Sequence, residues 1–156
     1  IRAAYSRLST EARNCITIEN EEMSYGIDDC LLLADLLPIV LDIHHNWIKT
    51  GDYIQHDSDT VARVVASWRG LRPTLHYSVS REDVLVGHCP DTLPDHATLL
   101  ANGHNKQKLR AHSDYYWNNA VNDWALIFND QFDIMCESKG KNLASFKLYE
   151  KLYGTI

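Results

Sequence analysis

The segment Ile39-Val40-Leu41-Asp42-Ile43-His44-His45-Asn46 decides the fold that the sequence predicts. Three apolar residues lead into a carboxylate, and two imidazoles follow without any Gly or Pro between. A continuous apolar run is typical of a strand that is buried on both faces, as in parallel sheets. We therefore expect Asp42 to lie where such a strand leaves the core.

Helical and strand patterns alternate on both sides of this segment. Because this alternation builds a parallel sheet with helices outside it, we predict an α/β protein made of parallel βα units. Its four strands amount to half of an eight-stranded barrel or to one small open sheet. The expected strands are Cys15–Ile18, Ile39–Ile43, Leu71–Tyr77 and Phe132–Cys136. The expected helices are Arg2–Glu11, Ser24–Leu37, Thr60–Arg69, Tyr115–Phe128 and Asn142–Tyr153.

Residues 79–111 interrupt this alternation, and a shorter loop is expected over residues 46–57. A loop as long as 79–111 is usually functional or carries short elements of its own. The length of residues 1–156 predicts a single domain. Because the chain starts at Ile1 within a helical pattern, we expect a fragment, a processed product or a partial chain.

The composition is that of an ordinary globular protein, with 45% hydrophobic and 23% charged residues. The net charge of −6 argues against nonspecific nucleic-acid binding, although a bound cation would reverse the sign locally. No apolar run is long enough to span a membrane. The scattered cysteines predict reduced core thiols and a cytoplasmic protein, or a nuclear one in a eukaryote.

Every expected strand ends on a potential metal ligand. Parallel strands bring their C-terminal ends to one rim, so residues far apart in sequence converge there. A repeat of this kind at all four ends favours a shared catalytic site over an accidental pattern. The residues are Glu19, then Asp42 with His44 and His45, then His76, then Glu137.

Carboxylates and imidazoles without a thiolate point to a catalytic divalent cation. Each residue also has a plainer interpretation. Glu19 extends into an acidic run, His76 could be a hydrogen-bonded core histidine, and Glu137 could pair with Lys139. Strand alternation would turn His44 inward together with Asp42, which leaves the choice between His44 and His45 open.

Five short motifs occur in the order seen in UV damage endonucleases, and the chain resembles that family from Arg7 to Leu152. The motifs are Ile16–Glu21, Leu41–Asn46, Leu75–Ser78, Arg110–Tyr115 and Asp133–Lys139, with Trp68 before the third strand. The resemblance implies a metal-dependent TIM-type barrel of the xylose-isomerase-like and endonuclease IV-like kind. It implies that this chain is the C-terminal half of that barrel, strands 5–8.

The resemblance also implies site residues and a substrate. It implies Mn as the cation, with Zn or Mg as alternatives, and hydrolysis of damaged double-stranded DNA on the 5′ side of UV-type lesions. It prefers His45 to His44, and it alone selects His112 over His96 and His104. The implied metal ligands are Glu19, Asp42, His45, His76, His112 and Glu137, of which Glu19, Asp42, His76 and Glu137 are the catalytic residues. The expected DNA contacts are Lys106, Lys108, Arg110 and Lys139, although a solvated basic turn explains the first three equally well.

The chain departs from the family in two respects. Thr74 stands where the family often has a Lys, which puts the number of metal ions in doubt. The first half of the barrel, which in the family supplies further histidine ligands and the residues that probe the duplex, is absent. A companion fragment or self-association is therefore expected, because open sheet edges invite pairing.

Two other functions fit the same residues. A sugar isomerase or epimerase of the same barrel group would also need carboxylates and histidines around a divalent ion, and the acidic charge mildly favours it. A non-catalytic half-barrel is the third hypothesis. The motifs Arg110-x-His112-x-x-Tyr115 and Glu137-x-Lys139 favour the endonuclease.

Overall fold

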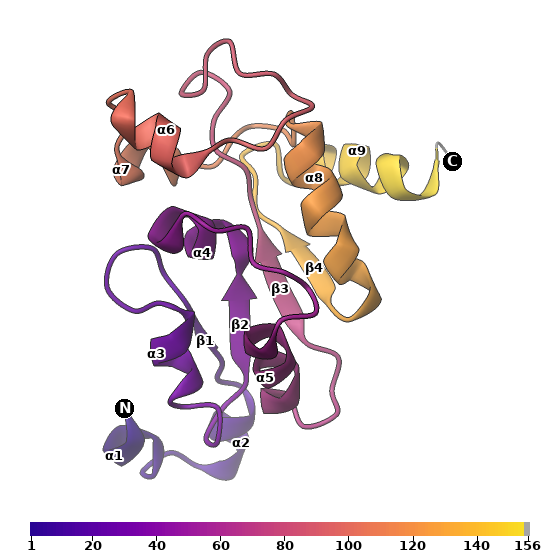
Figure 1. Cartoon of the computed structure of the whole chain (residues 1–156). Helices are drawn as coiled ribbons and strands as arrows, with labels where there is room; N and C mark the ends of the chain where they lie inside the picture. The colour runs from indigo at the N-terminus through magenta and orange to yellow at the C-terminus, as the bar shows by residue number, and fades with distance from the viewer. Residues whose placement is uncertain (155–156) are drawn as a thin grey trace.

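A computed structural model of the chain describes residues 1–154, so residues 155 and 156 of the predicted domain lie outside the described part (Figure 1). Four parallel strands form one sheet in the order β1-β2-β3-β4. The strands are β1 (Ile18–Glu19), β2 (Ile39–Asp42), β3 (Thr74–Tyr77) and β4 (Asp133–Cys136). The helices are α1 (Arg2–Tyr5), α2 (Thr10–Asn14), α3 (Ile27–Leu31), α4 (Ile43–Thr50), α5 (Asp59–Ser67), α6 (His96–Ala101), α7 (Lys106–Leu109), α8 (Asn119–Leu126) and α9 (Lys141–Tyr153), with a 3₁₀ turn at Ile127–Asp130.

Strand β2 occupies the interior of the sheet, between β1 and β3, and all four of its residues are buried. This confirms the α/β class and the parallel βα units. Strands adjacent in sequence are also adjacent in space, as they are in a TIM-type barrel. The assignment to barrel strands 5–8 stays a prediction.

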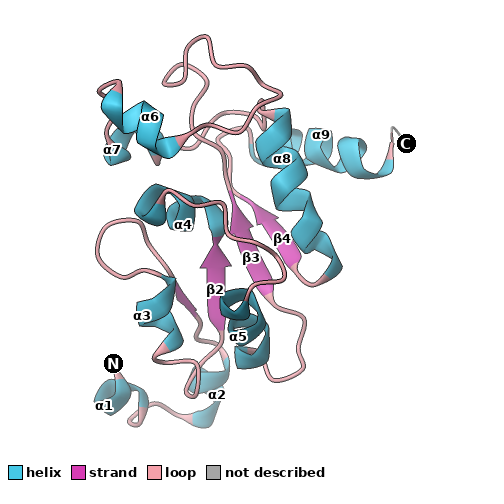
Figure 2. Cartoon of the chain, in the orientation of Figure 1, coloured by secondary structure: helices cyan, strands magenta, loops and turns pink. Residues whose placement is uncertain are grey.

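The two faces of the sheet have different roles. On one face, helices α3, α5 and α8 cover a core that includes Ile39, Leu41, Leu75 and Tyr77 (Figure 2). Side chains alternate between faces along a strand, and in-register neighbours share a face. The pairs Glu19↔Val40, Asp42↔His76 and His76↔Met135 therefore place the predicted ligands on the other face.

That second face is open in the described part of the chain. Met135, which lies on it beside His76, is 53% exposed. An interior barrel residue would be covered by the opposite strands. The four strand-end residues thus share a face as well as a rim, and that face opens to solvent here.

Helix α4 begins directly at the end of β2, which makes the predicted loop over 46–57 wrong in its first half. The Asp42 side chain caps the helix, because its Oδ1 accepts a hydrogen bond from the His45 N–H at 2.7 Å. Ile43, Trp47 and Ile48 are buried along it. Ile43 continues the apolar run of the strand in the sequence, although the helical spacing of α4 starts there.

Other boundaries also differ from the prediction. Helix α3 is much shorter than the expected Ser24–Leu37, because turns replace the helix after Leu31. The expected N-terminal helix is split in two, and Ser9 caps the second part by accepting from the Ala12 N–H. Strand β1 is shorter than the expected Cys15–Ile18, because it begins three residues later and ends one residue later, at Glu19.

The long excursion over 79–111 contains α6 and α7 and folds back onto its own start. An isolated antiparallel bridge pairs Ser80 with His112, and the Ser113 N–H donates to the Val79 carbonyl at 3.0 Å. Leu85 and Leu109 pack against α4. The excursion therefore returns the chain to the end of β3 and brings His112 to the rim.

The four cysteines are free thiols. Cys30 is buried and Cys136 half-buried, whereas Cys15 and Cys89 are exposed, so the expected core placement is wrong for the last two. Across residues 1–154, the structure contains no helix long and apolar enough to cross a membrane. The predicted compartment stays a prediction.

Gly140 allows the segment after His112 to lie against the end of β4. Its N–H donates to the Asp114 carbonyl at 2.9 Å, and an added Cβ would lie 2.5 Å from that oxygen. Gly26 is also a helix N-cap, but there an added Cβ would meet only the flexible end of Lys49.

We predict that Gly140→Ala lowers the free energy of unfolding by about 1–3 kcal/mol more than Gly26→Ala. Urea denaturation of both variants measures the difference, and equal losses would contradict it.

Candidate metal centre

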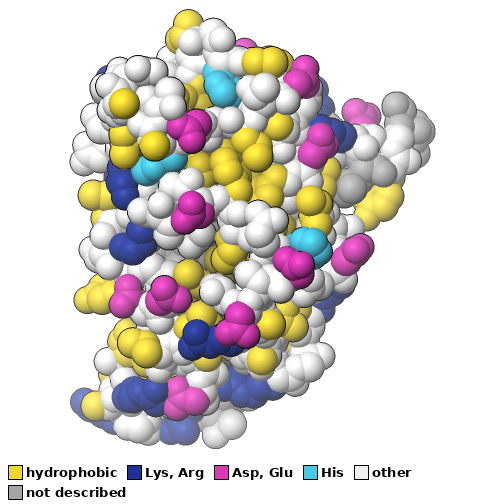
Figure 3. Space-filling view, in the orientation of Figure 1, with side chains coloured by type: hydrophobic (Ala, Val, Ile, Leu, Met, Phe, Trp, Pro, Cys, Tyr) yellow, Lys and Arg dark blue, Asp and Glu magenta, His cyan; other side chains and the backbone are white. Residues whose placement is uncertain are grey.

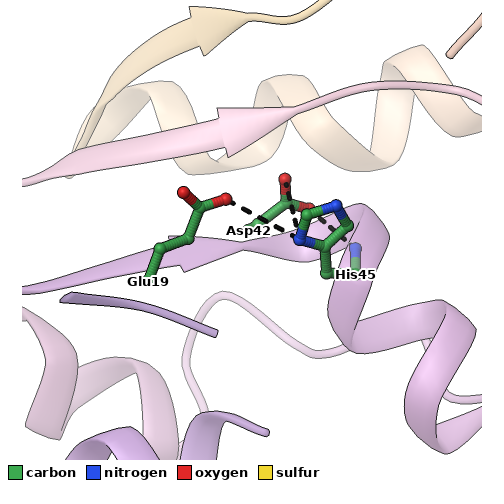
Figure 4. Close-up of side chains that lie close together, drawn as sticks. All are labelled: Glu19, Asp42 and His45. Atoms are coloured by element: carbon green, nitrogen blue, oxygen red, sulfur yellow. Dashed lines mark hydrogen bonds and ion pairs between the residues drawn. The ribbon is translucent and has the colours of Figure 1, made fainter. Parts of the chain in front are cut away.

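Glu19, Asp42 and His45 form one group of potential ligands (Figure 4). One ligand atom from each lies within 4.8 Å of the others. The His45 Nδ1 is 3.7 Å from Glu19 Oε1 and 3.6 Å from Asp42 Oδ2. Two strand ends and the first turn of α4 supply these side chains, which point toward one another.

Asp42, His76 and Glu137 form a second group with the same spacing. The His76 Nδ1 lies 3.1 Å from Glu19 Oε1 and 3.4 Å from Glu137 Oε1. The His112 Nε2 approaches Glu137 Oε2 at 3.9 Å. Since Asp42 belongs to both groups, the structure brings all six residues of the implied ligand set to one mouth.

Asp42 is the centre of this arrangement. Its side chain is fully buried, and its Oδ2 has no hydrogen-bond partner in the described part of the chain. The Asn20 amide holds the Asp42 backbone at both ends, donating to its carbonyl and accepting from its N–H at 2.9 Å each. Burial raises the pKa of Asp42 to about 7. An unpartnered buried oxygen among carboxylates and imidazoles fits a divalent cation, which takes oxygen and nitrogen ligands.

The imidazoles respond to the surrounding carboxylates. The pKa of His76 is raised, first by its contact with Glu19. Burial opposes charge on His45, but Asp42 and the neighbouring glutamates raise its pKa nonetheless. The pKa of Glu19 is lowered, because its contacts with the two histidines outweigh its burial. Burial instead lowers the pKa of His112, so positive charge is favoured at His45 and His76 but not at every imidazole of the mouth.

His44 lies outside the mouth, in the core. The Ser78 hydroxyl donates to its Nδ1 at 2.6 Å, and its Nε2–H donates to Ser80 Oγ at 3.2 Å, because Ser80 gives its own hydrogen to the Leu109 carbonyl. Burial lowers the pKa of His44 to about 3. Strand alternation does not apply, because the helix begins at Ile43. His45 is therefore the imidazole that faces Asp42 and Glu19.

Sequence reasoning missed two residues of this region. Asn20 and Glu22 were not predicted as site residues, because Asn20 lies within a short motif and Glu22 lies in a run of acidic residues. Glu22 is in fact buried, with its Oε2 3.6 Å from His45 Nε2. Its position depends on the turn after β1, where the Glu21 carboxylate accepts the Met23 N–H at 2.9 Å. No periodic pattern in the sequence signals that turn.

The four predicted DNA contacts fall into two classes. Lys106 donates to the Lys49 carbonyl at 2.9 Å, and Arg110 pairs with Glu22, so both make internal contacts. Lys108 and Lys139 are exposed. Figure 3 shows acidic and basic side chains interspersed on the visible face, without one continuous basic surface.

A cavity of about 710 Å³ lies beside the mouth, between the excursion and the segment after His112. Its walls include Arg81, His88, Ser113, Tyr115 and Trp117. Trp117 is fixed there, because its Nε1–H donates to the Ser80 carbonyl at 2.8 Å. The cavity thus has two aromatic residues in its wall, three and five positions after His112, together with the carboxylates of Glu82, Asp83 and Asp114.

We predict that Asp42→Asn stabilises the cation-free protein at pH 8. Asp42 keeps its proton up to about pH 7 when folded but loses it near its ordinary value of 3.8 when unfolded. Between these values the folded state binds more protons, so stability falls as pH rises, and a neutral amide avoids that loss. The expected gain is about 1–3 kcal/mol at pH 8 and none below about pH 4.

Urea denaturation in EDTA across this pH range measures the gain. Asp95→Asn is the matched control, because Asp95 also caps a helix but is exposed and has a lowered pKa. A gain of equal size in both variants, or none in Asp42→Asn, would contradict the assignment of Asp42 as an uncompensated buried carboxylate.

Comparisons with known proteins identify one family. The sequence model of the family described as UV-endonuclease UvdE matches residues 1–155. A UV-damage endonuclease of Schizosaccharomyces pombe is 27% identical over 154 residues, covering 94% of this chain and 22% of that protein. A UV DNA damage endonuclease of Halalkalibacterium halodurans is 32% identical over 143 residues, covering 88% of this chain and 37% of that protein.

The chain spans about a fifth to two fifths of the length of these two relatives. The match nevertheless extends over almost every residue of this chain, including all six residues at the mouth. The chain therefore belongs to the UV-endonuclease UvdE family.

Proposed function

We propose that this chain carries the metal-binding half of a DNA-repair endonuclease that hydrolyses a phosphodiester on the 5′ side of UV-type lesions. The observation that supports it best is the convergence of six carboxylate and imidazole groups around Asp42. The names of the relatives, all UV-damage endonucleases, support the substrate class. An isomerase would share the cation site, but no such relative supports it.

The cation would be held by Glu19, Asp42 and His45 on one side and by His76, His112 and Glu137 on the other. Mn is the first candidate, with Zn and Mg as alternatives. Bound there, a divalent cation supplies the Lewis acid that stabilises the phosphate and the departing oxygen. The Glu19 and Glu137 side chains are 34% and 30% exposed at the rim, so a carboxylate oxygen that the cation does not use could accept a proton from an attacking water.

Lys108 and Lys139 are the proposed phosphate contacts. Both are exposed, one on α7 and the other just after β4, so they lie on elements that border the mouth. Lys106 and Arg110 are not proposed as phosphate contacts, because Lys106 donates to the Lys49 carbonyl and Arg110 pairs with Glu22.

The aromatic cavity beside His112 suits an unstacked base. Lesions weaken stacking and so lower the cost of moving a nucleotide out of the duplex. Tyr115 and Trp117 line the cavity and could stack on such a base, although Lys147 Nζ already lies over one face of the Tyr115 ring. This cavity would let the protein bind the lesion next to the bond that is cut.

A partner is needed to close the open face. Tyr25 and Leu32 are exposed beside β1, and Leu143 and Phe146 are exposed on α9, next to β4. A cavity of about 780 Å³ also lies at the β1 edge. We propose that the N-terminal half of the barrel covers both edges, with a second copy of this chain as the alternative.

We predict that Glu19→Ala and His76→Ala each abolish cation binding. Both residues contribute to the mouth, so removing either leaves the buried Asp42 charge with fewer partners. Metal analysis after Mn²⁺ loading and gel filtration measures the content, with His104→Ala as a control outside the mouth. Unchanged content in both site variants would defeat the assignment.

We predict damage-dependent, cation-dependent nicking. Irradiated duplex with Mn²⁺ should be nicked on the 5′ side of lesions by the chain combined with its N-terminal half, whereas unirradiated duplex or added EDTA should give no product. Nicking that persists in EDTA would contradict the proposal. Nicking of both duplexes alike would refute the lesion specificity.

We predict that Lys108→Ala and Lys139→Ala weaken binding to irradiated duplex and each reduce the salt dependence of log K by about 1. Fluorescence anisotropy across a salt series measures this slope. Arg63→Ala is the control, because it removes the same charge from α5, on the covered face of the sheet. A slope change of equal size in the control would contradict the placement of these contacts.

A further inference from the structure

Glu22 is a buried carboxylate to which the proposed reaction gives no role. Its side chain is only 4% exposed, although it lies in a surface turn just after β1. A buried carboxylate is costly unless it is paired. Its position therefore calls for specific partners, and the structure supplies two.

The first partner is Arg110, whose Nη1 donates to Glu22 Oε1 at 2.5 Å. The second is His45, whose Nε2 lies 3.6 Å from Glu22 Oε2. The other ring nitrogen of His45, Nδ1, lies 3.1 Å from the Asn20 carbonyl. Nδ1 is also the nitrogen that faces Asp42 and Glu19, so a cation would take Nδ1 in place of its contact with Asn20. Nε2 then carries the ring hydrogen, on the side that faces Glu22.

The ion pair of Glu22 and Arg110 belongs to a set of contacts that joins three segments around the mouth. Arg110 belongs to the excursion and precedes His112 by two residues, whereas Glu22 follows Glu19 by three. Lys49 on α4 donates to the Met23 carbonyl at 3.2 Å, and Lys106 donates to the Lys49 carbonyl. The turn after β1, helix α4 and helix α7 therefore form a closed ring of contacts.

We propose that Glu22 and Arg110 are a positioning pair for the metal centre. Arg110 compensates the buried charge of Glu22, and Glu22 orients the His45 imidazole toward Asp42 and Glu19. Through this ion pair, the excursion, which carries Arg110, affects how tightly the site at His45 binds its cation. This inference rests on the proposed function, because it needs the cation to bind at His45.

The test measures Mn²⁺ affinity and urea stability in Glu22→Gln, Arg110→Met and the double variant. Because the residues act as one unit, we expect each variant, including the double, to bind Mn²⁺ 10- to 100-fold more weakly than the wild type, without additivity. Arg110→Met should be the least stable in EDTA, because it leaves the Glu22 charge buried and unpaired. The double variant should regain stability but not affinity.

Two controls sharpen the result. Glu21→Gln changes the neighbouring carboxylate, which contacts only backbone N–H groups of its own turn, and should bind Mn²⁺ as the wild type does. Arg110→Lys keeps the charge and should retain most of the affinity. Affinity can be read from the signal of free Mn²⁺ in electron paramagnetic resonance, which does not depend on nuclease activity.

Several outcomes would overturn the inference. Affinity that returns together with stability in the double variant would make the pair merely structural. Unchanged affinity in Glu22→Gln, or an equal loss in Glu21→Gln, would also refute it while leaving the proposed metal centre intact. A wild-type protein that binds no Mn²⁺ would refute the proposed function and this inference together.

Discussion

The structure depends on how Asp42 is held at the end of β2. Its backbone is fixed by the Asn20 amide, and one carboxylate oxygen starts α4 by accepting from the His45 N–H. The other oxygen is buried without a hydrogen-bond partner in the described residues. A single side chain therefore ends a strand, begins a helix and leaves one buried oxygen that could bind a cation. The destabilising charge is tolerated because β1, β2 and α4 all converge on it.

The open face explains why the site is exposed on one side. Pairing of the strands puts every predicted ligand from β1 to β4 on the face opposite the hydrophobic core. Helices cover the core face, as they cover the outside of a barrel. In the predicted barrel, the ligand face would be the inside, enclosed by a second set of strands. The geometry of the six groups is nevertheless present already, because the sheet alone fixes the positions of the strand ends.

Sequence patterns predicted the features that arise from local periodicity. The apolar run before Asp42 and the alternation of strands and helices sufficed to predict the parallel sheet and the convergence of Glu19, His76 and Glu137. Helix α4 was missed because Ile43 continues the apolar run of the strand, and only the capping contact of Asp42 separates the two. Glu22 and the internal partners of Lys106 and Arg110 could not be predicted, because they depend on contacts between segments up to 88 residues apart. His112 was selected by family resemblance alone, since its place at the rim requires a long loop to fold back.

The bridge between Ser80 and His112 separates the length of that loop from the chemistry at its base. The contacts of Ser80 with His112 and of Val79 with Ser113 hold the His112 imidazole in place at the base of the loop, whatever the number of residues between them. Closing a loop of twice the length costs only about 0.6 kcal/mol more, so insertions in its outer part are thermodynamically cheap. Evolution, or an engineer, can therefore remodel the outer surface of this loop while the cluster of potential ligands beneath keeps its dimensions.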